Sequence, residues 1–425
     1  MNASIVAMNA KIRWRLIVPT TFFMLLSALD RVNISFAALK MNDELGFTPA
    51  EYGFGAGVLF VGFLVGQYPS VLLLQRIGMR FWLGGSAILW GGSAAAMALI
   101  SSHGQFYVLR VVLGFVEGGL APGIVVYLSQ FAGERERATT FAMPMLAIPL
   151  SIVLGGPISG WLLGMAPPAG LSTWRWMFLG EAAPTILFGL FACFYFPNKP
   201  DEARWLDGEE KAWLAGNAAN RAETARRNDW SILRKPVMWA SALLWFCLLS
   251  GAYGIMFWLP QMVKQMTGLS PFSIGLVNAL PWAGSAIGIY VNATHSDRTG
   301  ERFWHIAVPA AVTAVAILLA ANAGPGALGL FFLLVAGVGL GAAQGAFWAL
   351  PTAMLTPATF AVGAVAINIA GSSGGIVVPY LVGLVRERTG GVDGPTWLVA
   401  AILLIAAGLV VAMRAVDDRR VAVAR

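Results

Sequence analysis

The chain has 425 residues, of which 58% are hydrophobic and 12% are charged, and it carries a formal net charge of +7 and a mean hydropathy of +0.71. A soluble protein has about 25% charged residues, so this composition excludes an ordinary soluble enzyme. The positive charge is not a signal for nucleic-acid binding, because the basic residues stand between the apolar runs, where Lys and Arg determine membrane topology. The composition therefore indicates a protein whose solvent is lipid.

Apolar runs follow one another along the chain, and each approaches the roughly 20 residues that a helix needs to cross the hydrocarbon layer. In lipid only helices and closed barrels satisfy the backbone hydrogen bonds, and runs this long and apolar are helices. The predicted fold class is therefore an all-α membrane protein with twelve transmembrane helices. They are predicted near 15–38, 51–74, 80–101, 105–129, 139–164, 175–196, 238–263, 273–293, 303–322, 327–355, 359–385 and 396–413.

One long polar stretch, 197–235, separates the sixth predicted span from the seventh. We therefore predict an N-terminal six-helix bundle over 1–196, a cytoplasmic linker loop with a surface helix over 197–235, and a C-terminal six-helix bundle over 236–425. With the N-terminus inside, the inner loops and tails hold 21 of the 28 Lys and Arg residues and the outer loops hold five. This asymmetry predicts that both termini are cytoplasmic.

The two halves share short motifs. Gln75-Arg76-Ile77-Gly78-Met79-Arg80 follows the second span, and Asp297-Arg298-Thr299-Gly300-Glu301-Arg302 follows the eighth, 222 residues later. Gly155-Gly156-Pro157 in the fifth span has a counterpart in Gly374-Gly375 of the eleventh. Parallel six-helix repeats build many alternating-access transporters, whose binding site lies between the repeats near mid-membrane.

Charged side chains of these motifs are the predicted gating residues. They are expected to bridge neighbouring helix ends and hold one state of the carrier closed; the alternative is simple anchoring of the cytoplasmic helix ends. The residues concerned are Arg76, Arg80, Asp297, Arg298 and Arg302.

The most informative residues are charges inside spans. An ionised side chain near the bilayer centre costs about 2.5–3.5 kcal/mol or more, so such residues usually face a cavity and have a partner. The first span carries Asp30, Arg31 and Asn33, and the fourth carries Arg110 and Glu117. Arg110 and Glu117 are two helical turns apart and share one helix face.

Two carboxylates and two arginines suit proton-coupled anion transport. A guanidinium stays charged and binds a carboxylate through two parallel hydrogen bonds. We predict that Asp30 and Glu117 take up protons, that protonation of Glu117 releases an arginine, and that Arg31 then binds the substrate carboxylate. The alternative is that these residues only form buried ion pairs that fix helix packing.

The C-terminal half has polar and aromatic groups where the N-terminal half has charges. Tyr253, Trp258, Gln344, Trp348 and Asn368 lie in its apolar runs. We expect the N-terminal half to handle charge and protons and the C-terminal half to shape the substrate pocket. Packing alone would also account for any single aromatic residue, whereas Asn368 is a lone amide in an apolar helix and needs a partner.

Together these residues make the chain resemble the major facilitator superfamily, and within it the anion:cation symporters, which carry tartrate, phthalate, galactonate and related organic acids. The resemblance spans nearly the whole chain. It is carried by Leu29-Asp30-Arg31-Val32-Asn33-Ile34, Pro69-Ser70 before Arg76-Ile77-Gly78, Glu117-Gly118-Gly119 with Pro122-Gly123, Trp205-Leu206 before Glu209-Glu210, Phe257-Trp258-Leu259-Pro260-Gln261, His295 to Arg302, and Asn368 before Gly374-Gly375.

The resemblance implies two six-helix bundles of the superfamily's fold in a bacterial-type inner membrane. It implies proton coupling at Asp30 and Glu117 and substrate binding by Arg31 with Arg110 in support. It also implies that Trp348 and Asn368 line the substrate pocket. From the residues themselves we predict that Asn33 and Tyr253 belong to the pocket too.

Four positions depart from the family pattern. Ala28 and Phe63 stand where the family often has Tyr, and Gln67 and Gln75 where it often has acidic residues. Two hydroxyls that a sugar acid would use are therefore missing. This favours a less hydroxylated or aromatic carboxylate as the substrate.

Three other readings remain. A proton-independent exchanger or uniporter would use the same arginines without needing Asp30 and Glu117. A drug–proton antiporter needs a pocket for cations, which Arg31 and Arg110 oppose. A membrane enzyme or sensor would need a nucleophile motif, a metal cluster or an output domain, and the sequence shows none of these. We expect no cofactor, no metal and no nucleic-acid partner, and we predict a monomer that binds a small organic acid, protons and the bilayer.

Overall fold

A computed structural model describes residues 3–132, 137–224, 230–324, 326–354 and 357–424. Every regular element in these ranges is helical. The α-helices are α1 (Ala3–Ile12), α2 (Val18–Leu45), α3 (Pro49–Ala96), α4 (His103–Glu117), α5 (Leu120–Leu128), α6 (Arg137–Gly164), α7 (Thr173–Tyr195), α8 (Gly208–Thr224), α9 (Pro236–Thr267), α10 (Pro271–Thr299), α11 (Trp304–Ala323), α12 (Ala327–Phe347), α13 (Ala349–Met354), α14 (Pro357–Thr389) and α15 (Asp393–Ala424).

Within the described residues, ten helices are long and apolar enough to cross a membrane, and Leu150–Gly164 is a shorter apolar helix. One of the ten, Pro49–Leu99, contains the second and third predicted spans. The other predicted spans each coincide with one of these helices, and Leu150–Gly164 lies in the fifth. The expected all-α membrane fold is confirmed.

Two glycines form sharp turns, or elbows, one in each copy of the repeated motif. Gly78 interrupts α3 with φ 79° and ψ 166°, and Gly300 ends α10 with φ 69°. A positive φ is strained for residues with a β-carbon, so glycine is required at both turns. A β-carbon on Gly78 would also lie 2.5 Å from Oδ1 of Asn198. Both copies of the motif therefore place a glycine at positive φ, with ψ of 166° at Gly78 and 0° at Gly300.

The chain groups into two compact units. Unit 1 comprises Met1–Arg31, Val61–Ile152 and Pro167–Arg226, and unit 2 comprises Val32–Phe60, Val153–Ala166 and Arg227–Arg425. Helices α2, α3 and α6 each continue from one unit into the other. The domain bounds predicted from the sequence remain a prediction.

In unit 1, α3 approaches α4 closely enough for backbone contact. A β-carbon on Gly62 would lie 2.0 Å from the Val111 carbonyl oxygen, and one on Gly66 would lie 2.0 Å from that of Phe115. Further along, α3 packs on α7, where Gly91 faces Ile186. Small residues permit such crossings, which bring α4 and α7 against the same helix.

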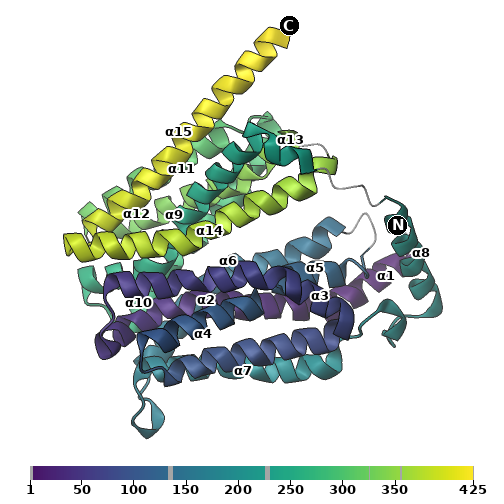
Figure 1. The fold of residues 1–425 in the computed structure, drawn as a ribbon, viewed down its shortest axis with the longest axis horizontal. Coiled ribbons are helices and arrows are strands. Elements are labelled where there is room, and N and C mark those ends of the chain that lie inside the picture. The colour runs from purple at the N-terminus through teal and green to yellow at the C-terminus, as the bar shows by residue number, and fades with distance from the viewer. Residues whose placement is uncertain (1–2, 133–136, 225–229, 325, 355–356, 425) are drawn as a thin grey trace. The chain divides into compact units, whose positions relative to one another are not determined.

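In unit 2, α9 packs against α14 and α15, and α12 packs against α10 and α11. These helices run from teal to yellow in Figure 1. The first turns of α3 join this group: Tyr52 donates a hydrogen bond to the Phe257 carbonyl oxygen at 3.1 Å, and Gly53 lies against Pro379. Gly156 of α6 lies against Gly275 of α10 in the same way.

The surface helix expected in the polar stretch is present as α8. Asp207 and Glu210 cap its first turn reciprocally, each side chain accepting a hydrogen bond from the other's backbone N–H. Lys11 of α1 pairs with Glu210 at 2.8 Å, which ties the start of the chain to this helix within unit 1.

The glycine crossing can be tested on two positions of the same helix. Gly66→Ala should destabilise the protein by about 1–3 kcal/mol, because its β-carbon meets the Phe115 backbone. Gly85→Ala is the matched control, because nothing lies within 4 Å of its β-carbon. It should be neutral or stabilising by up to about 1 kcal/mol. Thermal unfolding in detergent measures both, and equal midpoints would contradict the close crossing.

Candidate substrate and proton site

Asp30 lies at the centre of α2 and is 1% exposed. The indole Nε1 of Trp90, on α3, donates a hydrogen bond to its Oδ2 at 2.7 Å. Both residues belong to unit 1. A buried carboxylate costs free energy unless it is compensated, and this indole supplies one compensating donor.

Arg31 and Glu117 form an ion pair between α2 and the end of α4. The Nε of Arg31 lies 3.0 Å from Oε2 of Glu117, whose side chain is 0% exposed, whereas that of Arg31 is 19% exposed. Ser27, one turn before Arg31, donates to the same carboxylate oxygen at 3.2 Å and accepts from Arg31 Nη2 at 3.2 Å. The second oxygen of Glu117 is buried and has no hydrogen-bond partner among the described residues.

Arg110 completes this group. Its side chain is fully buried in α4, and its guanidinium is close enough to attract the carboxylates of both Asp30 and Glu117. The Arg31 guanidinium also lies over the ring of Phe63, 4.7 Å from its centroid. Phe63 therefore offers a cation–π face to this guanidinium.

The sequence analysis missed one charged residue inside a span. Glu181 lies on α7 with 5% of its surface exposed, and its carboxylate is close enough to interact electrostatically with that of Asp30. The signal was available, because Glu181 interrupts an apolar run just as Asp30 and Glu117 do.

The structure thus brings four of the predicted residues together in unit 1: Asp30, Arg31, Arg110 and Glu117. Asn33 is buried but belongs to unit 2. The sequence put Arg110 and Glu117 on one helix face, and the pairing of Arg31 with Glu117 is what the structure adds.

The predicted pocket residues of the C-terminal half all lie in unit 2. Tyr253 packs against Phe60, with ring centroids 4.6 Å apart, and Trp348 packs edge-on against Trp245 at 5.5 Å. Gln344 donates to the Leu248 carbonyl oxygen at 3.5 Å. Asn368 is exposed on α14. These positions are compatible with pocket roles for Tyr253, Trp348 and Asn368, which remain predictions.

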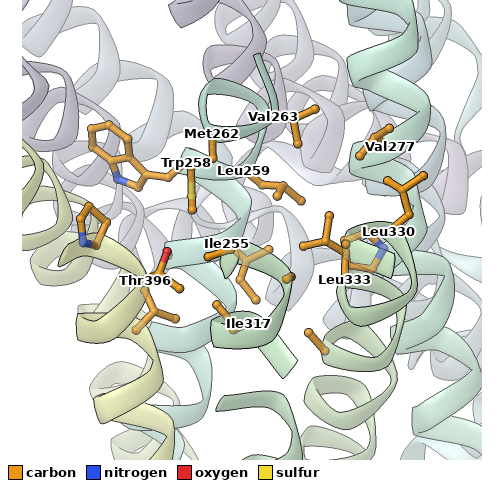
Figure 2. A pocket seen from close by; sticks show the side chains of 18 of the residues that line it. Ile255, Trp258, Leu259, Met262, Val263, Val277, Ile317, Leu330, Leu333 and Thr396 are labelled. Carbon is orange, nitrogen blue, oxygen red and sulfur yellow. The ribbon is translucent and has the colours of Figure 1, made fainter. Parts of the chain in front are cut away.

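A pocket in unit 2 is lined by aliphatic and aromatic side chains of α9, α10, α11, α12 and α15 (Figure 2). None of its lining residues is charged, and the labelled side chains include Ile255, Leu259 and Leu333. An anion would lose its hydration there without gaining a compensating partner, so this pocket is not the site of a carboxylate.

The elbow residues form local contacts. Arg80 donates from Nε to the Phe196 carbonyl oxygen at 3.2 Å, within unit 1, and Arg76 is exposed. In unit 2, Arg302 pairs with Asp297 at 2.6 Å and donates to Ser296 at 3.0 Å, while Arg298 is exposed. These contacts brace each turn, and the gating role of these residues remains a prediction.

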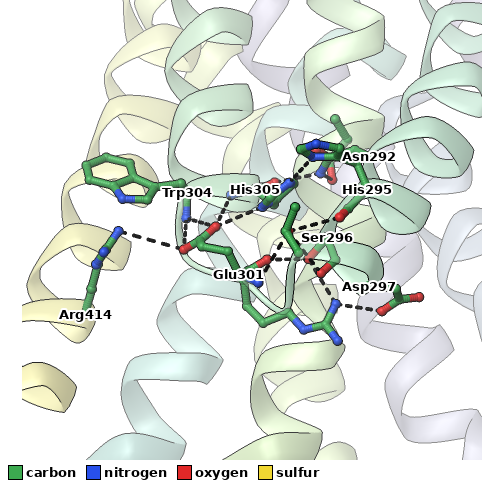
Figure 3. Close-up of polar contacts among 11 residues, drawn as sticks. Asn292, His295, Ser296, Asp297, Glu301, Trp304, His305 and Arg414 are labelled. Atoms are coloured by element: carbon green, nitrogen blue, oxygen red, sulfur yellow. Dashed lines mark hydrogen bonds and ion pairs between the residues drawn. The ribbon is translucent and has the colours of Figure 1, made fainter. Parts of the chain in front are cut away.

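Next to this turn, Glu301 caps the start of α11 (Figure 3). Its carboxylate accepts hydrogen bonds from the backbone N–H of Trp304 and of His305 and from Nδ1 of His305, at 2.9, 3.3 and 2.8 Å. His305 Nε2 lies 2.6 Å from Nδ1 of His295. Partial burial alone would raise the pKa of Glu301, but these hydrogen bonds outweigh it and hold the pKa below its usual range.

Residues 20–379 match the profile of the Major Facilitator Superfamily. The chain belongs to this superfamily. A "Putative tartrate transporter" of Agrobacterium vitis is 39% identical over 93% of this chain and 89% of its own length. A "Quinolone resistance transporter" of Acinetobacter baumannii is 32% identical over 92% of each chain.

Among solved structures, a bacterial homologue of the human lysosomal transporter Spinster, in an inward-facing and unoccupied conformation, superposes with a TM-score of 0.80 at 18% identity. The match covers 94% of this chain and 96% of that one. At this identity the likeness concerns the fold, which is the two-bundle fold of the superfamily. The protein is therefore a membrane transporter and not an enzyme.

The charge state of Asp30 in this facilitator can be tested through its indole partner. Trp90→Phe removes a hydrogen bond that is worth about 1.5–3 kcal/mol if Asp30 is ionised. Trp82→Phe is the matched control: Trp82 is equally buried and donates to the neutral hydroxyl of Ser70 at 3.0 Å, a bond worth about 0.5–1.5 kcal/mol. Thermal unfolding at neutral pH should show the larger loss for Trp90→Phe. In an Asp30→Asn background, the difference in stability loss between the two tryptophan variants should be smaller. An unchanged difference in that background would contradict a charge-assisted hydrogen bond from Trp90 to Asp30.

The Glu301 cap can be tested by pH. Because the pKa of Glu301 is lowered in the folded state, the cap contributes its full stabilisation above the ordinary glutamate pKa of about 4.3. This stabilisation is lost as the pH falls through the lower pKa that Glu301 has in the folded protein. Glu301→Gln should therefore lower stability by about 1 kcal/mol at neutral pH. Unfolding midpoints of the two proteins should converge as the pH falls below about 4. A gap that widens with acid would contradict the assigned direction.

Proposed function

We propose that this facilitator is a secondary active transporter that takes up a small organic anion, a carboxylate, together with protons by alternating access. The observation that carries the proposal is the ion pair between Arg31 and Glu117, in which the acid is fully buried and the guanidinium is partly exposed. A guanidinium binds the carboxylate of a substrate as readily as that of a side chain. Substrate and Glu117 therefore compete for Arg31.

This competition couples protons to substrate. A proton on Glu117 removes its charge, and Arg31 then carries a positive charge that a substrate carboxylate neutralises. Conversely, a substrate that takes Arg31 leaves Glu117 as a buried anion without its main partner, which favours its protonation. Each ligand thus favours binding of the other, which is the thermodynamic requirement of symport. Asp30, beside Trp90 and near Arg110, is the second proposed proton site.

The proposed substrate is a carboxylate with few hydroxyls or with an aromatic ring. Two arginines suit an acid, and Phe63 under the Arg31 guanidinium supplies an apolar face in place of a hydroxyl. One relative is named as a putative tartrate transporter, which supports an organic acid as the substrate. Another relative is named for quinolone resistance, so the proposal rests on the site's residues more than on the relatives' names. Tyr253, Trp348, Asn368 and Asn33 are proposed to shape the pocket.

The proposed orientation places both termini in the cytoplasm of a bacterial-type inner membrane, and the proposed transporting unit is a monomer. In this orientation the Arg76–Arg80 and Asp297–Arg302 elbows lie on the cytoplasmic side. Arg76, Arg80, Asp297, Arg298 and Arg302 are proposed to hold the cytoplasmic ends of the bundles in one of the two states.

Liposomes containing the purified protein and an internal pH indicator test the proposal. Addition of tartrate, phthalate and an aldonate in turn should acidify the interior with at least one acid. Asp30→Asn should abolish the acidification, because an amide cannot carry the proton. A stronger response to the aldonate than to the other two acids would contradict the proposed substrate class.

Two further variants test substrate binding by Arg31 and the choice between proton-coupled symport and proton-independent transport. Arg31→Lys keeps the charge but loses the planar pair of donors, so it should weaken substrate binding while the protein still folds. Substrate uptake that persists in Asp30→Asn without any pH change would exclude proton coupling through Asp30 and would favour a proton-independent exchanger or uniporter.

A further inference from the structure

A second group of charged and amide side chains lies in unit 2, where the last turns of α2, α9 and α14 meet the turn before α3. These helices contain the first, seventh, eleventh and second predicted spans, so their ends lie on one side of the membrane, which is the outer side in the proposed orientation. A cavity of about 570 Å³ there is the outer cavity, and sites for small molecules have volumes of about 300–1,000 Å³. Its polar lining residues are Asn42, Asp43, Gln261, Lys264, Gln265, Arg386 and Glu387.

Arg386 of α14 is a half-buried cation that is held by neutral groups. Its Nη1 and Nη2 donate to the side-chain oxygens of Gln261 and Gln265 of α9, each at 3.2 Å. Its guanidinium lies 5.3 Å from the ring centroid of Trp258. No carboxylate of the described residues lies within ion-pair distance of it. A guanidinium has five N–H donors, so three of them remain for an anion.

Two further donors line the outer cavity. Lys264 of α9 donates to the Leu39 carbonyl oxygen of α2 and lies 3.8 Å from Asp43, whose side chain is 83% exposed. An exposed ion pair of this kind contributes little stability, so another carboxylate can replace Asp43. The Nε2 of Gln261 is buried and has no hydrogen-bond partner among the described residues, because Arg386 holds the other end of this amide. Both groups therefore have a donor to offer.

The acids of the outer cavity do not satisfy these donors. Asp43 is largely exposed, and Glu387 is exposed and accepts the backbone N–H of Ala50, at the start of α3, at 3.4 Å. The outer cavity thus differs from the apolar pocket of Figure 2, which has no charged lining residue. A guanidinium, an ammonium and an amide N–H around one space suit a small carboxylate, which accepts several hydrogen bonds on two oxygens.

We propose that the outer cavity is a second carboxylate-binding site of the transporter, in which Arg386, Lys264 and Gln261 donate to the acid. Its lining residues come from α2 as well as from α9 and α14, so a bound acid connects these helix ends. In the proposed alternating access, the outer ends of the spans must separate before substrate can enter. A ligand stabilises the arrangement that it binds, so acid at this site slows uptake. This effect on uptake rests on the proposed function, whereas binding to the outer cavity does not.

Calorimetry on the purified full-length protein, with tartrate and phthalate as probes, tests the binding. An Arg31→Gln background removes the proposed substrate site, so the binding that remains belongs to the outer cavity. Arg386→Gln in this background should weaken that binding by about tenfold or more, the factor that one charge-assisted hydrogen bond supplies. Arg388→Gln is the matched control, because Arg388 is exposed on the same helix and does not line the outer cavity. It should leave the binding unchanged.

Gln261→Glu separates loss of the site from loss of the fold. It places a carboxylate beside the Arg386 guanidinium, so thermal stability should be retained while binding to the outer cavity disappears. In liposomes, wild-type uptake should decline at high external acid, and Gln261→Glu should remove this decline.

The possible failures of the inference and of the proposed function are distinct. Absence of binding in the Arg31→Gln background, equal binding with and without Arg386, or a decline of uptake that persists in Gln261→Glu would overturn the inference. None of these results affects acidification by the wild type. Absence of both acidification and Arg31-dependent binding would instead remove the proposed function.

Discussion

A charge within a hydrocarbon layer must be compensated by the protein, and the structure of this site depends on that constraint. Glu117 is withdrawn from solvent but is held by Arg31 and Ser27, and Asp30 is held by Trp90 with Arg110 nearby. Such pairs add little net stability compared with apolar packing. Their value is that one partner of the ion pair can be replaced. A proton on Glu117 replaces Arg31, and a substrate carboxylate on Arg31 replaces Glu117. Each replacement leaves the other ligand's site free to be filled.

The backbone packing makes this arrangement possible. Glycines at the α3–α4 and α3–α7 crossings let the helices approach until a β-carbon would meet the opposite backbone or side chains. Long polar side chains on three helices can then reach one another across a short distance. The same device recurs in unit 2, where α3 meets α14 and α6 meets α10 through glycine.

The sequence predicted the spans and four members of the site and revealed the repeated motif, because each of these rests on local information. Gly78 and Gly300 could be paired by a motif of six residues, and the structure gives both a positive φ. Glu181 was missed although it interrupts an apolar run in the same way as Glu117. Trp90 could not be found, because a tryptophan in a span is ordinary and only its distance to Asp30 distinguishes it.

The sequence by itself determined that this is a helical membrane transporter of the Major Facilitator Superfamily, since hydropathy, helix periodicity and short motifs depend on neighbours in the chain. Only the tertiary structure decided which acid is paired with which arginine. Arg31 and Glu117 are 86 residues apart, and Trp90 and Asp30 are 60 apart. Contacts at such separations are fixed by how the helices cross, and a crossing depends on side-chain volumes along two whole helices, which no local pattern encodes.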